Sequence, residues 1–183
     1  NNWDLGINKY VLKDLCDYWI SEYNWKQAEA DLNNLNHFIG EVDDLKIHFI
    51  YEKGKTSNSI PLLISHGWPG SFLEFKNIME PLTNPKKFGL NDEICFDLIV
   101  PSIPGFAFSK ASERPFGPRK IASYYNKLMT KVLNYKNYMA QGGDWGGAIS
   151  SWLGYDHQEF CKAIHLNIMI MRDKNGPQTE EER

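Results

Sequence analysis

The chain has 183 residues, of which 42% are hydrophobic and 14% aromatic, so it is long and apolar enough for a globular domain with a core. Its net charge is −3 with no basic block, which argues against a nucleic-acid surface, and no apolar run approaches the roughly 20 residues of a membrane span. Cys16, Cys95 and Cys161 are odd in number and far apart in the sequence, so neither the spacing of a disulfide framework nor that of a zinc site is visible. We therefore expect reduced core cysteines and a small-molecule partner.

A helical arm is predicted over residues 1–40. Asn8 can cap a first helix, whose apolar residues recur at helical spacing, and Asn24 can cap a second helix that ends near Asn34. A hairpin should follow, with strands 38–42 and 45–52 and the turn Asp43-Asp44. His48 falls on the strand face opposite Leu45 and Ile47, and we expect it to have a structural role.

From residue 60 onward, short apolar strands alternate with helices, the pattern of an α/β domain with a mostly parallel sheet and crossover helices. We assign residues 41–183 to this domain, which would hold half of a doubly wound sheet. The predicted strands are 61–65, 96–101, a run ending at Gln141, and 162–168. Helices are predicted after the first strand, with Phe72, Phe75, Ile78 and Met79 facing inward, then from Pro118 and after Trp145.

The stretch YMAQGGDWGGAIS, residues 138–150, places Asp144 at a strand-to-helix turn. Gly142 and Gly146 fit the small positions of a nucleophile elbow, usually written G-x-S-x-G, in which strand and helix approach too closely for a Cβ. The N-terminus of the following helix favours the ionised form of the Asp144 carboxylate. A helix N-cap without chemistry is the alternative interpretation.

An aspartate at this position, instead of serine, narrows the chemistry. Attack of a carboxylate on a saturated carbon gives an ester, which water can hydrolyse, so epoxides and alkyl halides become candidate substrates. Hydrolysis of that ester creates an oxyanion that needs preorganised donors. We predict that these donors are the backbone N–H groups of Trp145 and of Trp68, which lies in HGWPG. Pro69, in the same motif, cannot contribute because it has no N–H.

The motifs HGWPGSFLEF, PSIPGFAFS and GGDWGG resemble those of the α/β-hydrolase-fold epoxide hydrolases. The arm, with DLCDYWISEYNWKQAEADLNNLNHF followed by LKIHFIYEK, resembles the extra segment of their microsomal and juvenile-hormone branch. The resemblance implies that Asp144 is the nucleophile, that Trp145 and Trp68 supply the oxyanion donors, that neither a metal nor an organic cofactor is needed, and that an epoxide is opened to a vicinal diol. The further residues expected to contact the substrate are His66, Gly67, Pro69, Phe72, Phe106 and Phe108.

The aromatic residues near the predicted site favour a hydrophobic epoxide, although Phe106 and Phe108 could instead pack beneath their loop. In the family, a helical cap supplies tyrosines that protonate the epoxide, and a later acid and histidine activate water. None of these residues is in this chain, and His157 and His165 are poor substitutes. Residues 1–183 alone are therefore expected to show no turnover, and strand 162–168 is expected to have an unpaired edge.

Three interpretations stay open. The chain is the N-terminal half of an epoxide hydrolase whose other half is lost, cleaved or supplied by a complementing chain or oligomer; it is a haloalkane dehalogenase-like hydrolase; or it is a non-catalytic interaction module. The chain begins at Asn1, so an upstream leader or anchor stays open as well. The cytoplasm is the default compartment. The resemblance implies that the protein could also associate with the microsomal membrane, through a segment not present here.

Overall fold

The structure, a computed structural model, describes residues 3–90, 94–169 and 180, and the chain divides into two compact units, residues 1–35 and 36–183. The first unit contains the helices η1 (Trp3–Leu5), α1 (Lys9–Ser21) and α2 (Trp25–Asn33). The Asn8 side chain accepts a hydrogen bond from the N–H of Tyr10 at 2.9 Å, and that of Asn24 accepts from Gln27 at 3.1 Å. Both predicted N-caps are confirmed.

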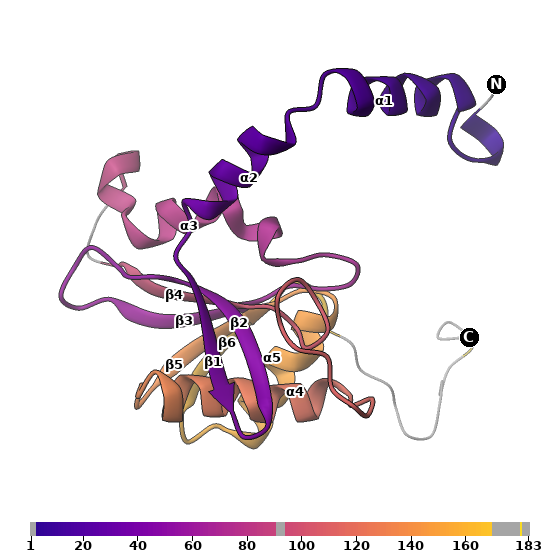
Figure 1. Cartoon of the computed structure of the whole chain (residues 1–183). Helices are drawn as coiled ribbons and strands as arrows, with labels where there is room; N and C mark the ends of the chain where they lie inside the picture. Colours follow the sequence, from indigo (N-terminus) through magenta and orange to yellow (C-terminus); the bar gives the residue numbers. More distant parts are fainter. Residues whose placement is uncertain (1–2, 91–93, 170–179, 181–183) are drawn as a thin grey trace. The chain divides into compact units, whose positions relative to one another are not determined.

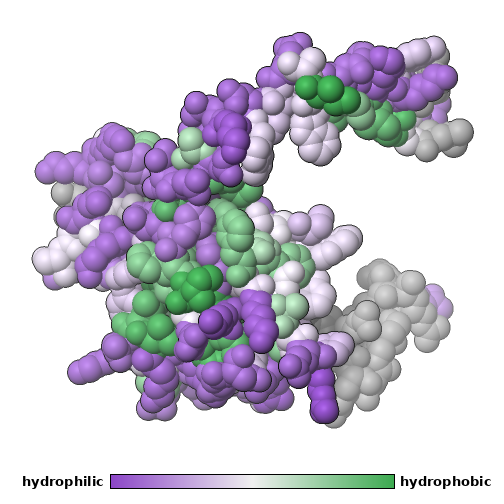
Figure 2. Space-filling view, viewed as in Figure 1, coloured by the Kyte–Doolittle hydropathy of each residue, from purple (hydrophilic) through white to green (hydrophobic). Residues whose placement is uncertain are grey.

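Helix α1 is amphipathic, and its apolar side chains lie along one side, visible as a green band in Figure 2. None of its residues is buried. This exposure corrects one expectation, because Cys16 lies on α1 and is exposed, whereas Cys95 and Cys161 are buried as predicted. Among the residues that the structure describes, no helix is both long and apolar enough to cross a bilayer.

The second unit is built on one mixed sheet, whose described strands run in the order β1-β2-β4-β3-β5-β6 (Figure 1). Strands β3 to β6 are parallel and confirm the predicted α/β pattern, while the β1/β2 hairpin joins the same sheet through antiparallel pairing of β2 with β4. The strands are β1 (His37–Val42), β2 (Leu45–Glu52), β3 (Ile60–Ser65), β4 (Phe96–Pro101), β5 (Tyr138–Gly142) and β6 (Cys161–Leu166).

Helices cover both faces of this sheet (Figure 1). Helices α4 and α5 pack on one face, where Leu63 and Ala140 of the sheet meet Tyr125 and Ile149 in the buried core. Helix α3 lies over the other face, where Met79 is buried as predicted but Ile78, also expected to face inward, is 42% exposed. The helices are η2 (Phe72–Phe75), α3 (Lys76–Thr83), η3 (Pro85–Phe88), α4 (Pro118–Lys127), η4 (Leu128–Val132) and α5 (Trp145–Asp156).

Strand β6 is the outermost strand on its side of the described sheet, as expected for the strand predicted at 162–168. Most of its residues are exposed, including the apolar Ile164 at 41%. Within the described part of the chain, β6 therefore presents an apolar surface and an edge without a further strand, the kind of edge that invites pairing with another polypeptide.

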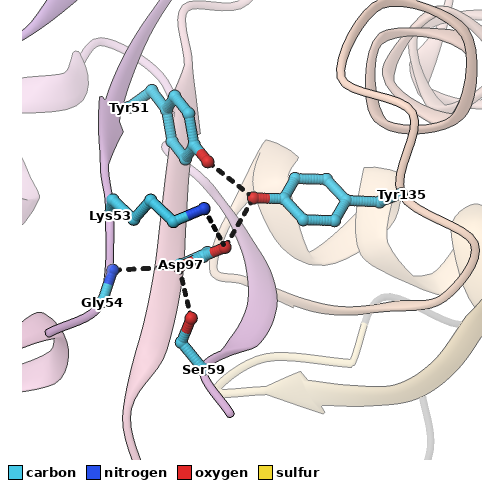
Figure 3. A network of polar contacts seen from close by, with 6 residues as sticks. All are labelled: Tyr51, Lys53, Gly54, Ser59, Asp97 and Tyr135. Atoms are coloured by element: carbon cyan, nitrogen blue, oxygen red, sulfur yellow. Dashed lines mark hydrogen bonds and ion pairs between the residues drawn. The ribbon is translucent and has the colours of Figure 1, made fainter. Parts of the chain in front are cut away.

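A buried carboxylate connects several segments at the end of the sheet where the parallel strands β3 and β4 begin (Figure 3). Asp97, the second residue of β4, is 4% exposed. Its Oδ1 accepts hydrogen bonds from the Gly54 N–H at 2.9 Å and the Ser59 hydroxyl at 2.5 Å, and its Oδ2 accepts from the Tyr135 hydroxyl at 2.7 Å. The Tyr135 hydroxyl also lies 2.8 Å from that of Tyr51. Asp97 therefore ties the connection between β2 and β3 to the segment before β5.

This network generates a prediction for stability. Burial raises the pKa of Asp97, but the hydrogen bonds from Ser59, Tyr135 and Gly54 and the Lys53 ammonium lower it by more, so its pKa lies below the ordinary value. A lowered pKa stabilises the folded state above the unfolded pKa of about 3.9, and this contribution is lost as the pH falls through the folded pKa. Asp97→Asn should therefore cost about 1.5–3 kcal/mol of unfolding free energy at pH 7, and this deficit should shrink below pH 4.

Urea unfolding of both proteins across this pH range measures the effect. The matched control is Glu41→Gln, because Glu41 is 72% exposed in its ion pair with Lys46 and should contribute at most about 0.5 kcal/mol. A deficit for Asp97→Asn that is equally large at pH 7 and pH 3 would contradict a role for the charge.

Candidate active site

The carboxyl ends of β3 and β5 lie side by side, because these parallel strands are neighbours and Ser65 is the register partner of Gly142. HGWPG leaves β3 at this level, and the turn that contains Asp144 leaves β5. The N–H of Trp68 donates a hydrogen bond to Oδ1 of Asp144 at 2.8 Å. The structure thus brings together the two motifs that the sequence placed on separate strands.

The backbone at Asp144 is strained, as expected for the tight strand-to-helix turn predicted there. Its φ of 50° and ψ of −126° lie in a region that non-glycine residues rarely adopt. A Cβ at Gly146 would lie 2.0 Å from the carbonyl oxygen of Ser65, and one at Gly142 would lie 2.0 Å from that of Gly146. Glycine is therefore required at both positions, as the sequence predicts. The sharp turn places Asp144 directly after the carboxyl end of β5.

Main-chain groups set the charge of Asp144. The backbone N–H of Trp68 and then that of Trp145 lower the pKa of its carboxyl below the ordinary value, against a small opposing effect of burial. Trp145 is also the first residue of α5, whose N-terminus favours an anion. Asp144 is exposed and therefore ionised at neutral pH, while Trp68 and Trp145 are themselves 67% and 44% exposed.

His66 holds this loop from below. The side chain is 0% exposed, its Nδ1 lies 2.9 Å from the carbonyl oxygen of Gly67, and its Nε2 accepts a hydrogen bond from the N–H of Ile103 at 3.0 Å. These partners require a proton on Nδ1 and none on Nε2, and burial lowers the pKa of the ring, so the imidazole is neutral. His66 joins the loops after β3 and β4 and is not open to solvent.

The other residues predicted to contact the substrate differ in their exposure to solvent. Phe72 is 3% exposed and packs against the rings of His37, His48 and Phe108, so its burial does not fit an open pocket wall. Gly67 is buried next to Asp144, and the half-buried Phe106 lies against His66 with 5.4 Å between ring centroids. Pro69 and Phe108 are exposed.

Two contacts near Asp144 were missed by sequence reasoning. One is the Ile103 N–H on His66; the other is Asn167, whose Oδ1 would lie 2.3 Å from a Cβ at Gly143. The pairing of Gly142 with Leu166 places Asn167 there, and the only signal in the sequence is its position at the end of the neighbouring strand. In the described part of the chain, no cluster of histidine, cysteine and acidic residues could hold a metal ion.

Neither His157 nor His165 is among the groups that contact the Asp144 carboxylate in the described part of the chain. His157 follows α5 as its C-cap, and His165 of β6 lines an apolar groove of about 440 Å³. This groove lies between α3 and the sheet, is lined by residues such as Ile64, Met139 and Leu82, and does not include Asp144. It is therefore distinct from the candidate site.

Comparisons with known proteins agree with this geometry. Residues 1–75 match the family model described as epoxide hydrolase N terminus, and residues 60–178 match that of the alpha/beta hydrolase fold. The chain is 42% identical to juvenile hormone epoxide hydrolase 1 of Ctenocephalides felis and 40% identical to epoxide hydrolase 1 of Oryctolagus cuniculus. These alignments cover 93% and 91% of this chain and 37% of each relative.

Solved structures give the same result. The juvenile hormone epoxide hydrolase of Bombyx mori superposes with a TM-score of 0.84 at 32% identity, over 93% of this chain and 40% of that one. The epoxide hydrolase of Aspergillus niger superposes with a TM-score of 0.81 at 33% identity, over 98% of this chain and 46% of that one. The chain thus spans less than half the length of these proteins.

The packing of Gly67 against Asp144 generates a prediction. A Cβ at Gly67 would lie 2.5 Å from the Cβ of Asp144 and 2.6 Å from its Oδ1, so Gly67→Ala must move Asp144 and the HGWPG loop apart, which should lengthen the hydrogen bond from the Trp68 N–H. The pKa of Asp144, measured by NMR titration of its carboxyl carbon, should rise toward the ordinary value of about 3.9. Gly117→Ala is the control, because a Cβ there meets no atom within 4 Å. An unchanged pKa in Gly67→Ala would show that Trp68 does not set this charge.

Proposed function

We propose that this chain, which belongs to the α/β hydrolase fold family, contains the nucleophile of an epoxide-opening site. Within that family, it groups with the epoxide hydrolases that carry an epoxide hydrolase N-terminal region. The observation that carries the proposal is the Asp144 carboxylate, ionised on a strained elbow and held by a main-chain N–H at 2.8 Å. A carboxylate in this position is suited to displacement at a saturated carbon.

In the first step, Oδ2 of Asp144 attacks one carbon of the epoxide ring. A bond forms between Oδ2 and that carbon, the carbon–oxygen bond of the ring breaks, and the released alkoxide takes a proton from an acid. Oδ1 is not the attacking oxygen in this proposal, because it accepts the hydrogen bond from Trp68. The product is a 2-hydroxyalkyl ester of Asp144, whose free hydroxyl contains the former epoxide oxygen.

In the second step, water gives a proton to a base and adds to the carboxyl carbon of this ester, and that proton is returned to Oδ2 when the diol leaves. Oδ1 then becomes an oxyanion, and the N–H groups of Trp68 and Trp145 are the donors that stabilise it. Collapse of the intermediate breaks the bond between the carboxyl carbon and Oδ2, so Oδ2 leaves in the diol and the oxygen of water stays on Asp144. The same two donors contact the carboxylate before the reaction, but their stabilising effect is proposed to be largest in the second step, in which negative charge develops on Oδ1.

The acid and the base are proposed to come from outside the described residues. The carboxylate contacts of Asp144 in the described part of the chain are with the Trp68 and Trp145 N–H groups, and both ring nitrogens of His66 are engaged. Acid and base groups each contribute about 10²–10⁴ in rate, so without both the reaction should be slower by about 10⁴–10⁸. Residues 1–183 alone are therefore proposed to alkylate Asp144 once and not to turn over.

The substrate is proposed to be a hydrophobic epoxide. Trp68 and Trp145, whose N–H groups approach Asp144, have exposed indole rings, and Phe108 is exposed on the loop after β4. His66 and Phe72 are buried, so they are proposed to support these loops and not to contact the substrate.

The nucleophile is tested by mass spectrometry. Full-length protein incubated with an aryl epoxide should carry a substrate-mass adduct on the peptide that contains Asp144, and a single turnover in ¹⁸O-water should leave the label on that peptide. Asp144→Ala should abolish both signals, whereas Asp156→Ala, in a surface ion pair with Arg119, should keep them. Residues 1–183 alone should stop at about one adduct per chain. An adduct confined to a cysteine or histidine would contradict the assignment.

The reaction and substrate class are tested together with a panel of three compounds. An aryl epoxide should give diol with a much higher kcat/KM than an epoxide bearing a carboxylate or ammonium group, because the exposed rings offer that charge no partner. Equal values for the two epoxides would exclude a hydrophobic site. Halide release from a chloroalkane, without diol from either epoxide, would favour a dehalogenase instead.

A further inference from the structure

A histidine from the β1/β2 hairpin is bonded to both ends of the loop 102–109, which follows β4. The His48 side chain is 2% exposed, and its Nδ1 lies 2.8 Å from the hydroxyl of Ser102. The His48 N–H donates to the Ser109 hydroxyl at 2.9 Å, and the Ser102 N–H donates to the His48 carbonyl oxygen at 2.8 Å. The Ser109 hydroxyl donates to the Ser102 carbonyl oxygen at 2.8 Å, which closes the ring of bonds.

The loop that His48 holds is bonded in turn to the Asp144 site. Ile103, the neighbour of Ser102, donates its N–H to Nε2 of His66 at 3.0 Å, and Nδ1 of His66 lies 2.9 Å from the carbonyl oxygen of Gly67. That carbonyl belongs to the peptide whose N–H is that of Trp68, the donor to Asp144. Each link is buried except the last, so an unbroken series of contacts joins the loop after β4 to this peptide.

We propose that His48 is a positioning residue for the Trp68 donor, acting through the Ser102 hydroxyl, the Ile103 N–H and the His66 ring. The inference rests on the proposed function, in which this donor stabilises the oxyanion of ester hydrolysis. His48 touches neither Asp144 nor the reacting atoms in this account, so its effect falls on the geometry of one hydrogen bond.

The surroundings of His48 suit a fixed, neutral ring. Its Nε2 lies 2.9 Å from Nδ1 of His37, and the rings of Phe72 and Phe108 lie within 5.3 Å of it, centroid to centroid. Burial, and then the neighbouring His37, lower the pKa of His48 to about 4. The ring therefore stays uncharged at neutral pH, and its hydrogen bond to Ser102 is not exchanged for a charged one.

Two substitutions separate the two nitrogens of the ring. In His48→Asn the amide occupies the place of Nδ1 and can still bond Ser102, whereas in His48→Gln it reaches the place of Nε2, toward His37, and leaves Ser102 without its partner. In the full-length protein, His48→Gln should slow hydrolysis of the Asp144 ester by about 10-fold, a fraction of the 10²–10³ cost of losing a donor outright. Formation of the ester should change by less than about twofold, so the ester accumulates.

Ser102→Ala removes the same hydrogen bond from the other side and leaves the ring of His48 in place. It should reproduce the slow hydrolysis step, and combining it with His48→Gln should add little, because both remove one link. Equal hydrolysis rates in His48→Asn and His48→Gln, or an equal slowing of both chemical steps, would overturn the proposal. A loss of thermal stability without a step-specific effect would also overturn it, since it would leave His48 with a structural role alone.

Amide hydrogen exchange provides a test that does not depend on activity. His48→Gln and Ser102→Ala should accelerate exchange of the Ile103 and Trp68 N–H groups relative to His48→Asn, and unchanged protection of both would refute the coupling. If the unsubstituted protein opens no epoxide, the proposed function fails, whereas these exchange rates still decide whether His48 positions Trp68.

Discussion

The candidate site depends on the close approach of α5 to the end of β3. At Gly146, in the first turn of the helix, the carbonyl oxygen of Ser65 is so close that a Cβ would not fit. Ser65 is in turn paired with Gly142 on the neighbouring strand. This contact fixes where the turn between β5 and α5 can run. The turn must then pass beside HGWPG, and the Asp144 carboxylate comes within hydrogen-bonding distance of Trp68. Sheet register, glycine positions and carboxylate charge are parts of one constraint.

Local features of the sequence were sufficient to predict the elements and the tight turn that carries Asp144, whereas the role of Asp144 stays a prediction. Asn8 and Asn24 are N-caps, the four parallel strands follow the apolar runs, and Gly142 and Gly146 flank the elbow at Asp144. Each of these depends on interactions within a few residues or on the pairing of adjacent strands. The convergence of Trp68 on Asp144 was predictable for the same reason, since the carboxyl ends of neighbouring parallel strands meet at one edge.

Contacts between residues distant in sequence were not predictable in this way. Asp97 was read as part of a buried strand, and nothing local indicates that Ser59 and Tyr135 would share its carboxylate. Phe72 was expected at the mouth of the pocket because it is aromatic and follows HGWPG, but the β1/β2 hairpin extends the sheet and places His37 and His48 against its ring. Amphipathic spacing likewise predicted Ile78 as inward, although it is exposed beside a groove.

The donors to Asp144 are main-chain groups, and this separates two properties that are joined in many sites. Any residue except proline at position 68 or 145 presents an N–H in the same place, so the indole rings of Trp68 and Trp145 are free to vary without altering the charge that Asp144 experiences. The surface that an incoming molecule meets can therefore diverge during evolution while the electrostatics of the elbow are inherited unchanged. Under the proposed function, selectivity would depend on the side chains of these two residues and reactivity on their main-chain N–H groups, so substitution could change the first without loss of the second.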